Sequence, residues 1–391
     1  MDPKEVKIEE VNVKDLYTFA CQISRQYEDK SIIPITEHRA LAQTKNPYAD
    51  ENDVGLLVAY IGKKCIGYIG ILPGLLKIED RFSKVYFPST LYVTPEYRRY
   101  GIGKVLVLHS MALNYDLVFT GVSESADRLY RKLNLSELES LEYSVIDFNR
   151  VNIFLFASLL LKKILKGIGI RSIVSDKAVR ISRVLFSSFK KLLYRIVLSG
   201  QEKRLDEISY REVSKIHEED MRGKDNAQFI EFHRNASVIN WMLQFKWVGK
   251  RNEEKLEDLD YYFSSVRESF KFIALKVFSS DEKDSKGFLV LSVSSNNLNT
   301  ELKLLDFYCS DHADFKYIFS LVLKYARIHN ADSIVLPDSL NRYIKSHKFV
   351  RLLIRRRKRT YFLYPKNEKS PLATLKNKIT LNYCDGDTPF T

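Results

Sequence analysis

Apolar and polar residues alternate along this chain with two recurring periods. Runs with a period of two predict strands, and runs with a period of three to four predict amphipathic helices. In the first 150 residues the pattern predicts a strand over 6–12, a hairpin of two apolar strands over 55–74, and further strands over 89–95, 116–122 and 141–148. It predicts helices over 13–27, 102–114 and 123–134. The hairpin is expected to turn at Gly62-Lys63-Lys64.

The same order of elements returns after residue 200. Residues 204–213 open this second region, and a helix around Trp241 follows. Strands are predicted over 270–278, 286–295, 302–309, 333–337 and 359–365, and helices over 312–329 and 340–349. The repeated order predicts two copies of one α+β fold.

The length of 391 residues is too great for one ordinary domain. We therefore expect a first domain over 1–150, a helical linker over 151–200, and a second domain with a C-terminal tail over 201–391. The chain holds 23 Tyr and 23 Phe, so each half can bury a sizeable core.

Cysteine usage and the N-terminus favour a soluble, cytoplasmic protein without a metal. The four cysteines show neither CxxC nor metal-ligand spacing, as expected in a reducing compartment: Cys21, Cys65, Cys309 and Cys384. The N-terminal stretch MDPKEVKIEE lacks the apolar core of a signal peptide. The longest uncharged apolar run has 10 residues, 152–161, whereas roughly 20 are needed to span a bilayer.

Positive charge is concentrated between the two regions. The formal net charge is +13, and residues 151–200 hold ten Lys or Arg against one acid, Asp176. Apolar residues recur there at helical spacing: Ile181, Val184, Leu185, Phe189, Leu192 and Ile196. We interpret the segment as a linker helix that packs its apolar face and leaves its lysines in water. A stripe that binds a membrane surface or nucleic acid is the functional alternative.

The segment YRRYGIGKVL (97–106) places two glycines where a helix is predicted to begin. Glycine costs a helix about 1 kcal/mol relative to alanine, so the pair calls for an explanation. The first N–H groups of a helix have no internal acceptor and favour anions, phosphate above all. Gly101 and Gly103 would let the backbone approach a diphosphate closely, and three cations flank them: Arg98, Arg99 and Lys104. A tight strand-to-helix turn without a ligand is the alternative.

This segment resembles the coenzyme A motif of the GNAT acyltransferase superfamily, (Arg/Gln)-x-x-Gly-x-(Gly/Ala), as Arg98-x-x-Gly101-x-Gly103. The stretch SESADRLYRKLNL (123–135) resembles the second family motif, Asn-x-x-Ala-x-x-x-Tyr. Ser123 replaces the asparagine there, and Tyr130 matches. Asn134 replaces a glycine, a mild change because asparagine tolerates the left-handed conformation. The resemblance covers residues 5–150 by motif and 205–365 only by the order of elements.

The resemblance implies two GNAT-like domains, each a mixed sheet flanked by helices, with the second one degenerate. It also implies an acyl-CoA site in the first domain. The residues carried over to this site are Leu91, Tyr92, Val93, Arg98, Arg99, Tyr100, Gly101, Ile102, Gly103, Lys104 and Ser123. In such enzymes the strand before the loop diverges from its neighbour and holds the pantetheine arm, and one of its N–H groups stabilises the oxyanion. Tyr130 would protonate, or donate a hydrogen bond to, the departing thiolate.

Three residues are candidates for the acceptor side of the site. His38 is our candidate for the base that deprotonates the amine, although water or the leaving thiolate could take the proton instead. Arg234 and Trp247, near the predicted helix around Trp241, could hold and stack on a sugar or base; aromatics at helical spacing are more often core.

The loop of the second half, LLDFYCSDHADFKYIF (304–319), contains no glycine. Asp311 and His312 stand at the position of the phosphate loop, where an acid caps a helix and repels a diphosphate. We therefore expect this copy not to bind coenzyme A, and a Cys309–His312 pair is only a weak candidate for chemistry. The tail NYCDGDTPF (382–390) could approach the site, but we interpret it as a frayed terminus.

Tandem chains of this length resemble nucleotide-sugar N-acyltransferases of surface-polysaccharide pathways, of the anthrose N-acyltransferase type. The resemblance implies direct transfer from acyl-CoA to the amino group of a dTDP-linked amino-deoxysugar, and a positive net charge suits both anionic substrates. Two alternatives stay open. One is an aminoacyl-tRNA-dependent transferase of cell-wall peptide synthesis, a group that lacks the glycine loop, and the other is a non-catalytic acyl-CoA-binding protein. We expect small-molecule partners, no nucleic acid and no transmembrane segment, and the sequence does not define an oligomeric state.

Overall fold

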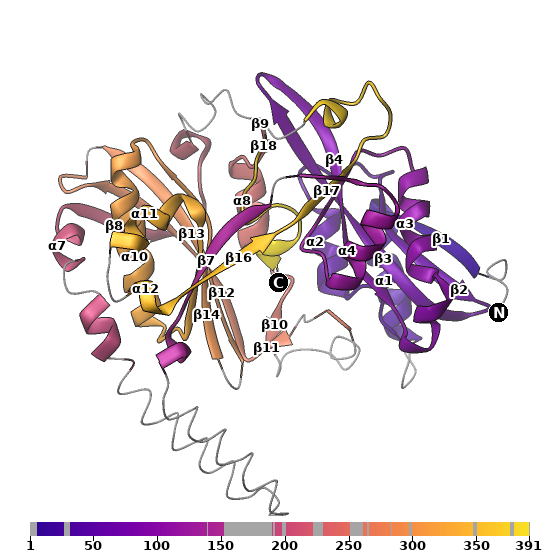
Figure 1. Cartoon of the computed structure of the whole chain (residues 1–391), viewed down its shortest axis with the longest axis horizontal. Helices are drawn as coiled ribbons and strands as arrows, with labels where there is room; N and C mark the ends of the chain where they lie inside the picture. Colours follow the sequence, from indigo (N-terminus) through magenta and orange to yellow (C-terminus); the bar gives the residue numbers. More distant parts are fainter. Residues whose placement is uncertain are drawn as a thin grey trace, which may run out of the picture. The chain divides into compact units, whose positions relative to one another are not determined.

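The structure, a computed structural model, describes most of the chain. The described residues are 6–26, 32–138, 140–151, 190, 192–197, 201–221, 230–250, 261–263, 266–282, 284–296, 299–346, 350–375 and 379–390. The chain divides into two compact units, whose elements are labelled in Figure 1. Unit 1 comprises Met1–Leu141, Ser214–Phe270 and Lys358–Thr391, and unit 2 comprises Glu142–Val213 and Lys271–Arg357.

Unit 1 is built on one mixed sheet with the strand order β1-β2-β3-β4-β5-β17-β6. These strands are β1 (Val6–Asn12), β2 (Val54–Ile61), β3 (Lys64–Ile78), β4 (Arg81–Val93), β5 (Leu117–Thr120), β17 (Tyr361–Tyr364) and β6 (Ser136–Glu137). Two short strands, β9 (Ile230–Phe232) and β18 (Ile379–Thr380), pair with each other, and β9 also pairs with β3. Neighbours from β1 to β4 are antiparallel, whereas β4 and β5 are parallel.

The predicted hairpin is confirmed. β2 and β3 pair from Ile61 and Lys64 outward, and Gly62 in the turn has a φ of 58°. β3 continues well beyond the predicted strand, however, and a second hairpin turns at Glu79 into β4. The strand expected over 89–95 is therefore only the end of a 13-residue strand.

Helices cover both faces of this sheet. α1 (Leu16–Arg25) and α2 (Glu37–Thr44) pack on one face, and α3 (Ile102–Ala112) and α4 (Glu124–Lys132) on the other. The alternation along β2 shows the division, because Leu56 and Val58 join the core under α1 and α2, while Leu57 joins the core under α3 and α4. A further helix of unit 1, α8 (Ala236–Gln244), lies where a helix around Trp241 was expected.

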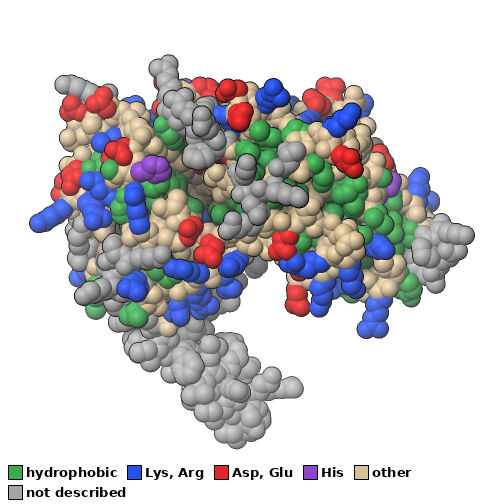
Figure 2. All heavy atoms as spheres, turned by 45° about the horizontal axis from the view of Figure 1, so that its top comes forward, with side chains coloured by type: hydrophobic (Ala, Val, Ile, Leu, Met, Phe, Trp, Pro, Cys, Tyr) green, Lys and Arg blue, Asp and Glu red, His purple; other side chains and the backbone are tan. Residues whose placement is uncertain are grey.

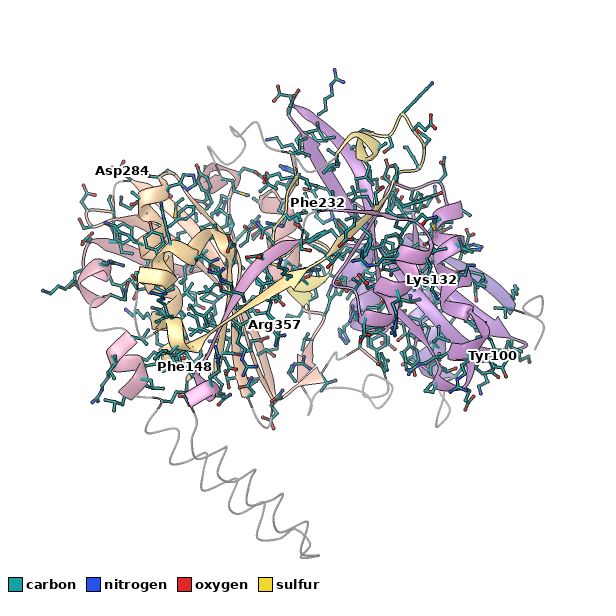
Figure 3. The ribbon with its side chains drawn as sticks, viewed as in Figure 1. Tyr100, Lys132, Phe148, Phe232, Asp284 and Arg357 are labelled. Atoms are coloured by element: carbon teal, nitrogen blue, oxygen red, sulfur yellow. The ribbon has the colours of Figure 1, made fainter. Side chains whose placement is uncertain are left out.

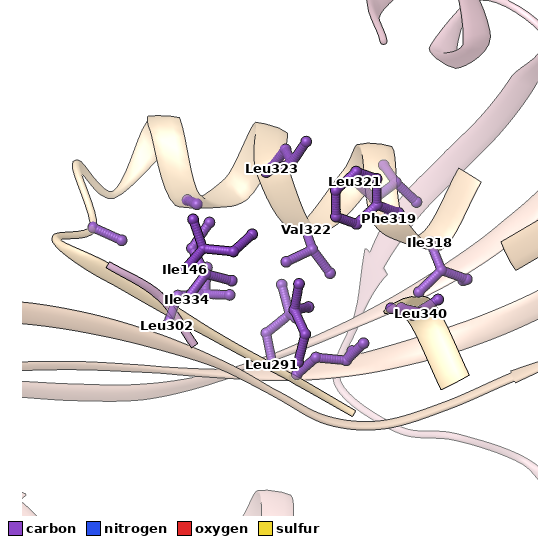
Figure 4. Close-up of a cluster of buried hydrophobic side chains, with 14 of the residues drawn as sticks. Ile146, Leu291, Leu302, Ile318, Phe319, Leu321, Val322, Leu323, Ile334 and Leu340 are labelled. Atoms are coloured by element: carbon purple, nitrogen blue, oxygen red, sulfur yellow. The ribbon is translucent and has the colours of Figure 1, made fainter. Parts of the chain in front are cut away.

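Unit 2 holds a second sheet with the order β16-β7-β15-β14-β13-β12-β8. Its strands are β16 (Ile354–Arg359), β7 (Leu141–Asp147), β15 (Ser333–Pro337), β14 (Asn299–Cys309), β13 (Ser285–Asn296), β12 (Ser269–Ser279) and β8 (Ile208–Val213). The helices of this unit are α7 (Glu202–Leu205), α10 (Phe315–Ile328), α11 (Asn341–Ser346) and α12 (Val350–Leu353). Figure 4 shows α10 above this sheet, with Val322 directed toward Leu291 and Ile318 next to Leu340.

The two sheets repeat one order of elements. β12, β13, β14, α10 and β15 follow one another as β2, β3, β4, α3 and β5 do, and each series ends in a parallel pair, β14–β15 or β4–β5. This repetition confirms the α+β class and the two copies expected from the sequence.

The units nevertheless do not follow the expected boundaries of 1–150 and 201–391. β7, the last strand of the first region, pairs with β15 in the second sheet, and β17, from the end of the second region, pairs with β5 and β6 in the first. Each sheet thus takes a strand from the other half of the chain. The reason is that hydrophobic alternation predicts a strand but not the sheet that the strand joins.

Most of the expected linker, residues 152–189, 191 and 198–200, lies outside the described residues. At its described end Lys190 is 4% exposed, and its Nζ lies 2.6 Å from Asp332 Oδ1. Leu193 and Val197 are buried there, while Leu192 and Ile196, which we expected on the apolar face, are exposed. The expected face was therefore wrong by one position at this end.

The surface carries charges of both signs. On the face shown in Figure 2, Lys and Arg side chains lie among acidic and apolar ones rather than in one patch. Within the described residues, no helix is both long and apolar enough to cross a membrane.

Candidate functional site

β4 and β5 pair at a single position and then diverge. Tyr86 pairs with Leu117, and the Tyr86 N–H donates to Asp116 O at 2.8 Å. From Phe87 to Val93, a stretch described throughout, β4 has no partner residue in β5. One edge of this stretch is therefore free of the sheet's own ladder, and its backbone groups can serve a ligand.

A β-bulge lies within the diverging part of β4. Tyr92 pairs with Tyr68, whereas the next pair joins Ser89 to Gly70, so two residues of β4 oppose one of β3. Thr90 at the bulge has a φ of 54°, a conformation that costs a non-glycine residue free energy. Bulges bend a strand and redirect its side chains, so this one accounts for a change of direction in β4 before the turn.

The predicted turn follows β4 directly. A 3-10 helix, Pro95–Tyr100 (η3), leads into Gly101, and α3 begins at Ile102; Tyr100 is labelled in Figure 3. Gly101 has a φ of 76°, in the left-handed region that favours glycine. A Cβ at Gly101 would meet no heavy atom within 4 Å, and one at Gly103 would meet only Val93 Cγ2, at 3.8 Å. The space before the N-terminus of α3 is therefore open to a ligand.

Charge around this turn is net positive. The acid of the turn, Glu96, pairs with Lys64 at 3.0 Å. Among the described residues, Arg99 and Lys104 form no ion pair, and both are exposed. The free N–H groups at the N-terminus of α3 and two unpaired cations favour an anion.

Arg98 is tied back to the strand. Its Nε donates to Val93 O at 3.1 Å, and its guanidinium carbon lies 5.9 Å from the Tyr92 ring. Tyr92 also packs against Tyr262, with ring centroids 4.3 Å apart. Arg98 therefore fixes the junction of β4 and the turn as well as adding charge.

Tyr130 lies on α4, and its ring is buried between the sheet and the helix. The centroids of Phe119 on β5 and Phe362 on β17 lie 4.6 and 5.6 Å from its own. Burial raises the pKa of the phenol well above its ordinary value of 10. The hydroxyl therefore stays protonated at neutral pH and can donate a hydrogen bond.

Ser123 stands at the N-cap of α4. Its Oγ accepts from the Ala126 N–H at 3.3 Å, as a capping residue does. Asn134, which stands where the family motif has glycine, has a φ of 56°. This is the left-handed conformation, which asparagine tolerates, so the replacement of glycine by asparagine fits the backbone there.

His38 begins the first turn of α2. Its Nε2 lies 2.9 Å from Trp247 O and 3.4 Å from Thr36 Oγ1. Because a carbonyl oxygen only accepts, Nε2 carries a proton and donates to it. Any role of His38 as a base would therefore use Nδ1.

Trp247 does not provide the stacking surface that we expected. Its side chain is fully buried, and its ring stacks on Phe390 with centroids 4.0 Å apart. The guanidinium carbon of Arg39 lies 4.7 Å from the ring centroid. The ring therefore packs within unit 1, and a sugar has no exposed face on which to stack.

Arg234, the other residue that we expected to contact the acceptor substrate, forms an ion pair with Asp385 at 3.0 Å. Asp385 has no exposed side-chain surface, and burial raises its pKa to about 6. Arg359 adds hydrogen bonds from its guanidinium to Tyr383 O and Asp385 O, at 2.9 and 3.1 Å. Arg234 thus anchors the C-terminal tail in this structure.

The tail is not a frayed terminus. A Cβ on Gly386 would lie 3.1 Å from Thr120 Cγ2 on β5 and 3.3 Å from Phe87 Cδ1 on β4. The tail therefore passes where β4 and β5 separate, and our expectation was wrong because tertiary contacts, not local sequence, order it.

Sequence reasoning also missed the buried Arg39 of α2, since a lone arginine on a helix ordinarily lies in water.

The corresponding turn of unit 2 is closed by its own side chains. Asp311 Oδ1 accepts from the Ala313 N–H at 2.8 Å, and Asp314 pairs with Lys286 at 3.3 Å. Burial raises the pKa of the Cys309 thiol to about 12, so it stays protonated and poorly nucleophilic. In the part of the chain that the structure describes, no group of three His, Cys, Asp or Glu residues could hold a metal.

Comparison with known proteins identifies the part of the chain that carries this site. Residues 52–134 match the sequence model described as an acetyltransferase (GNAT) domain. They run from just before β2 past α4 and include the diverging strands, the glycine turn and Tyr130. This segment is therefore similar to a GNAT acetyltransferase domain.

Three solved structures with similar folds are distant from this chain in sequence. A GCN5-related N-acetyltransferase from Anabaena variabilis is 12% identical, over 93% of this chain and 73% of its own, with a TM-score of 0.45. A tandem GNAT protein of the clavulanic acid pathway is 10% identical, over 93% and 99%, with a TM-score of 0.46. Saccharomyces cerevisiae N-myristoyltransferase with bound myristoyl-CoA is 10% identical, over 96% and 84%, with a TM-score of 0.48. No curated protein matches the sequence.

Proposed function

We propose that the chain is an acyl-CoA-dependent N-acyltransferase with its donor site in unit 1. One observation carries the proposal: Gly101, in a left-handed conformation, opens onto empty space before α3, next to a strand whose edge is free. The GNAT match over residues 52–134 supports the same reading.

The residues at the turn fit the diphosphate of coenzyme A. The N–H groups of Ile102, Gly103 and Lys104 begin a helix and lack intrahelical acceptors. A side chain at Gly101 would fill the space that the diphosphate needs. Arg99 and Lys104 would neutralise its charge, and exposed Tyr100 and Arg98 would border it.

The free edge of β4 fits the pantetheine arm. Leu91, Tyr92 and Val93 lie beyond the last contact with β5, so the backbone groups on the edge that faces away from β3 are the donors and acceptors available to its amides. Val93 O is not among them, because it accepts from Arg98 Nε. When bound, acyl-CoA supplies an acyl group activated as a thioester. One N–H of this stretch would stabilise the negative charge that develops on the acyl oxygen.

Tyr130 would act on the sulfur side of the reaction. Its pKa is raised by burial, while a thiol has an ordinary pKa near 8.5, so full proton transfer from the phenol to a thiolate is uphill. Tyr130 is therefore better suited to donate a hydrogen bond to the departing sulfur. The acceptor amine attacks directly, and its proton goes to His38 Nδ1 or to water.

For the acceptor we propose the amino group of a dTDP-linked amino-deoxysugar of surface-polysaccharide synthesis. The net charge of +13 supports an anionic acceptor, as does the resemblance to nucleotide-sugar N-acyltransferases. Arg234 is engaged in an ion pair with Asp385, and the Trp247 side chain is buried. Neither residue therefore offers the contact with a sugar that the sequence had suggested.

Release of free thiol from acetyl-CoA, measured with a panel of amino-sugar nucleotides, tests this proposal. Acceptor-dependent thiol release that requires Gly101 supports it. Acyl-CoA binding without thiol release for any amine would instead indicate a binding protein. Binding of aminoacyl-tRNA with a steep salt dependence and no dependence on Gly101 would favour the tRNA-dependent class.

A further inference from the structure

A buried arginine in unit 1 lacks an anionic partner. Arg39, on α2, is 1% exposed, and its Nη1 has no hydrogen-bond acceptor. No described Asp or Glu forms an ion pair with it. Asp387 lies near enough to raise the pKa of the neighbouring Tyr261 phenol, but it is not within ion-pair distance of Arg39. Burying an uncompensated charge is strongly unfavourable, so such a group calls for a counter-ion.

Aromatic rings surround this guanidinium without satisfying it. Its carbon lies 4.7 Å from the Trp247 ring centroid and 5.1 Å from that of Tyr261. These cation–π contacts stabilise the charge. They leave the N–H of Nη1 without an acceptor, however, because a ring face replaces an acceptor only weakly.

Two further buried donors of the same cluster are also unpartnered. The Trp247 Nε1 and the Tyr68 hydroxyl have no hydrogen-bond acceptor, and both side chains are fully buried. The Tyr68 ring lies 6.1 Å from that of Tyr261, and the charge of Arg39 acts on the Tyr68 phenol. More than nine in ten buried polar groups in proteins are paired. Three unpaired donors in one cluster, one of them on Arg39 itself, therefore indicate a missing acceptor.

We propose that Arg39, Trp247 and Tyr68 form a subsite for a carboxylate of the acceptor substrate. A carboxylate offers about four lone-pair directions in a plane, which suits a guanidinium with two added donors. The cluster is at most 1% exposed, so a compact, singly charged group fits it better than a phosphate. One turn along α2, Gln43 Oε1 is a buried acceptor without a donor, and it suits an N–H near the carboxylate.

The position of the cluster links it to acyl transfer. This part rests on the proposed acyl-CoA-dependent transfer to an amine, but it replaces the dTDP-linked sugar, which has no carboxylate, by an acceptor amine that carries one. The Tyr68 ring lies 5.6 Å from that of Tyr92, and the Tyr261 side chain hydrogen-bonds to Thr90 in the bulge of β4. A carboxylate held by Arg39 would therefore set the rest of the acceptor beside the strand proposed for the pantetheine arm. We infer that a carboxylate would enter beside Tyr261, because its chain neighbour Tyr262 is 59% exposed.

The subsite can be tested without acyl-CoA. Propionate and propionamide have the same skeleton and differ in charge, and thermal unfolding is measured with each at constant ionic strength. Propionate at about ten times its Kd should raise the Tm by roughly 2–4 °C, and propionamide should not. Arg39→Met should abolish the difference, while Arg128→Met, which removes an exposed arginine of α4, should keep it.

The unliganded stability of Arg39→Met gives a second readout. An uncompensated buried cation is a cost, so its replacement by methionine should leave the Tm of the free protein unchanged or higher. A merely structural arginine would instead lower the Tm on replacement. Should Arg39→Met fail to fold, Tyr68→Phe keeps the ring, removes one donor and should weaken propionate binding about 5- to 10-fold.

The outcomes separate this inference from the proposed function. Equal effects of propionate and propionamide, or a propionate shift that survives in Arg39→Met, overturn the subsite. A propionate shift that depends on Arg39, in a protein that never acylates an amine, keeps the subsite and overturns the proposed function. If acyl transfer occurs but does not prefer a carboxylate-bearing amine over its amide, the link between subsite and acceptor is wrong.

Discussion

Tyr86 and Leu117 form the bridge at which β4 and β5 meet, and beyond it the two strands diverge. The consequence is a free strand edge that leads directly into the turn at Gly101. A parallel pair that stayed together to Val93 would have used these backbone groups in its own ladder. The divergence therefore leaves the strand edge that we propose for the pantetheine arm, and the glycine turn that we propose for the diphosphate follows it directly.

The turn can be probed with a matched pair of glycine variants. Gly101→Glu should weaken coenzyme A binding by at least about 100-fold, because a carboxylate would occupy the space and repel the diphosphate. Gly62→Glu is the control, since Gly62 also has a positive φ and open surroundings but lies in the β2–β3 turn. Isothermal titration calorimetry with coenzyme A measures both. Equal affinities in the two variants would argue against the proposed cradle.

Replacement of Tyr130 by phenylalanine tests its hydroxyl. Tyr130→Phe keeps the ring contacts with Phe119 and Phe362, so the Tm should change little. The kcat should fall by roughly 10- to 100-fold with little change in KM for acyl-CoA, as expected for a hydrogen bond to a charged sulfur. Because burial raises the pKa of Tyr130, the wild type should show no loss of rate from this group between pH 6 and about 9. An unchanged kcat in the variant would remove the hydroxyl from the mechanism.

Local sequence predicted the centre of this site well. The strand, the glycine turn and α3 were all expected, because the alternation, the two glycines and the helical spacing lie within 26 consecutive residues, 89–114. Gly101 could be recognised as special because its neighbours predict a helix that glycine would otherwise weaken.

Asp385 gives a prediction about stability and pH. Burial raises its pKa from 3.8 to about 6, so between these values the folded protein binds more protons than the unfolded chain. The free energy of unfolding of the wild type should therefore decrease from about pH 4 to pH 6, by on the order of 2–3 kcal/mol from this group. Denaturant unfolding of the wild type and Asp385→Asn at each pH isolates the contribution. A wild-type advantage that grows as the pH rises would contradict the assignment.

Cys309 should be dispensable for activity. Its pKa is raised to about 12 by burial, so little thiolate is present at neutral pH. Cys309→Ala should keep acyl transfer within about twofold of the wild type, measured as thiol release. A loss of more than tenfold in a folded variant would mean that unit 2 contributes to the chemistry.

The rest of the structure could not be predicted, for identifiable reasons. β7 and β17 were expected as strands, but their exchange between the sheets depends on partners nearly 200 and 240 residues away. The burial of Arg39 could not be predicted, because the rings that cover it, Trp247 and Tyr261, come from a segment more than 200 residues away. The apolar face of the linker helix was misplaced by one residue, which a helical period cannot resolve at a helix end.

The central claim is that the N-terminus of α3 holds the diphosphate of coenzyme A. A crystal structure of the protein with coenzyme A tests it most directly. The account predicts diphosphate oxygens at about 3 Å from the backbone nitrogens of Ile102, Gly103 and Lys104, with the pantetheine arm along β4 from Leu91 to Val93. Coenzyme A bound elsewhere, with the turn at Gly101 left empty, would contradict it.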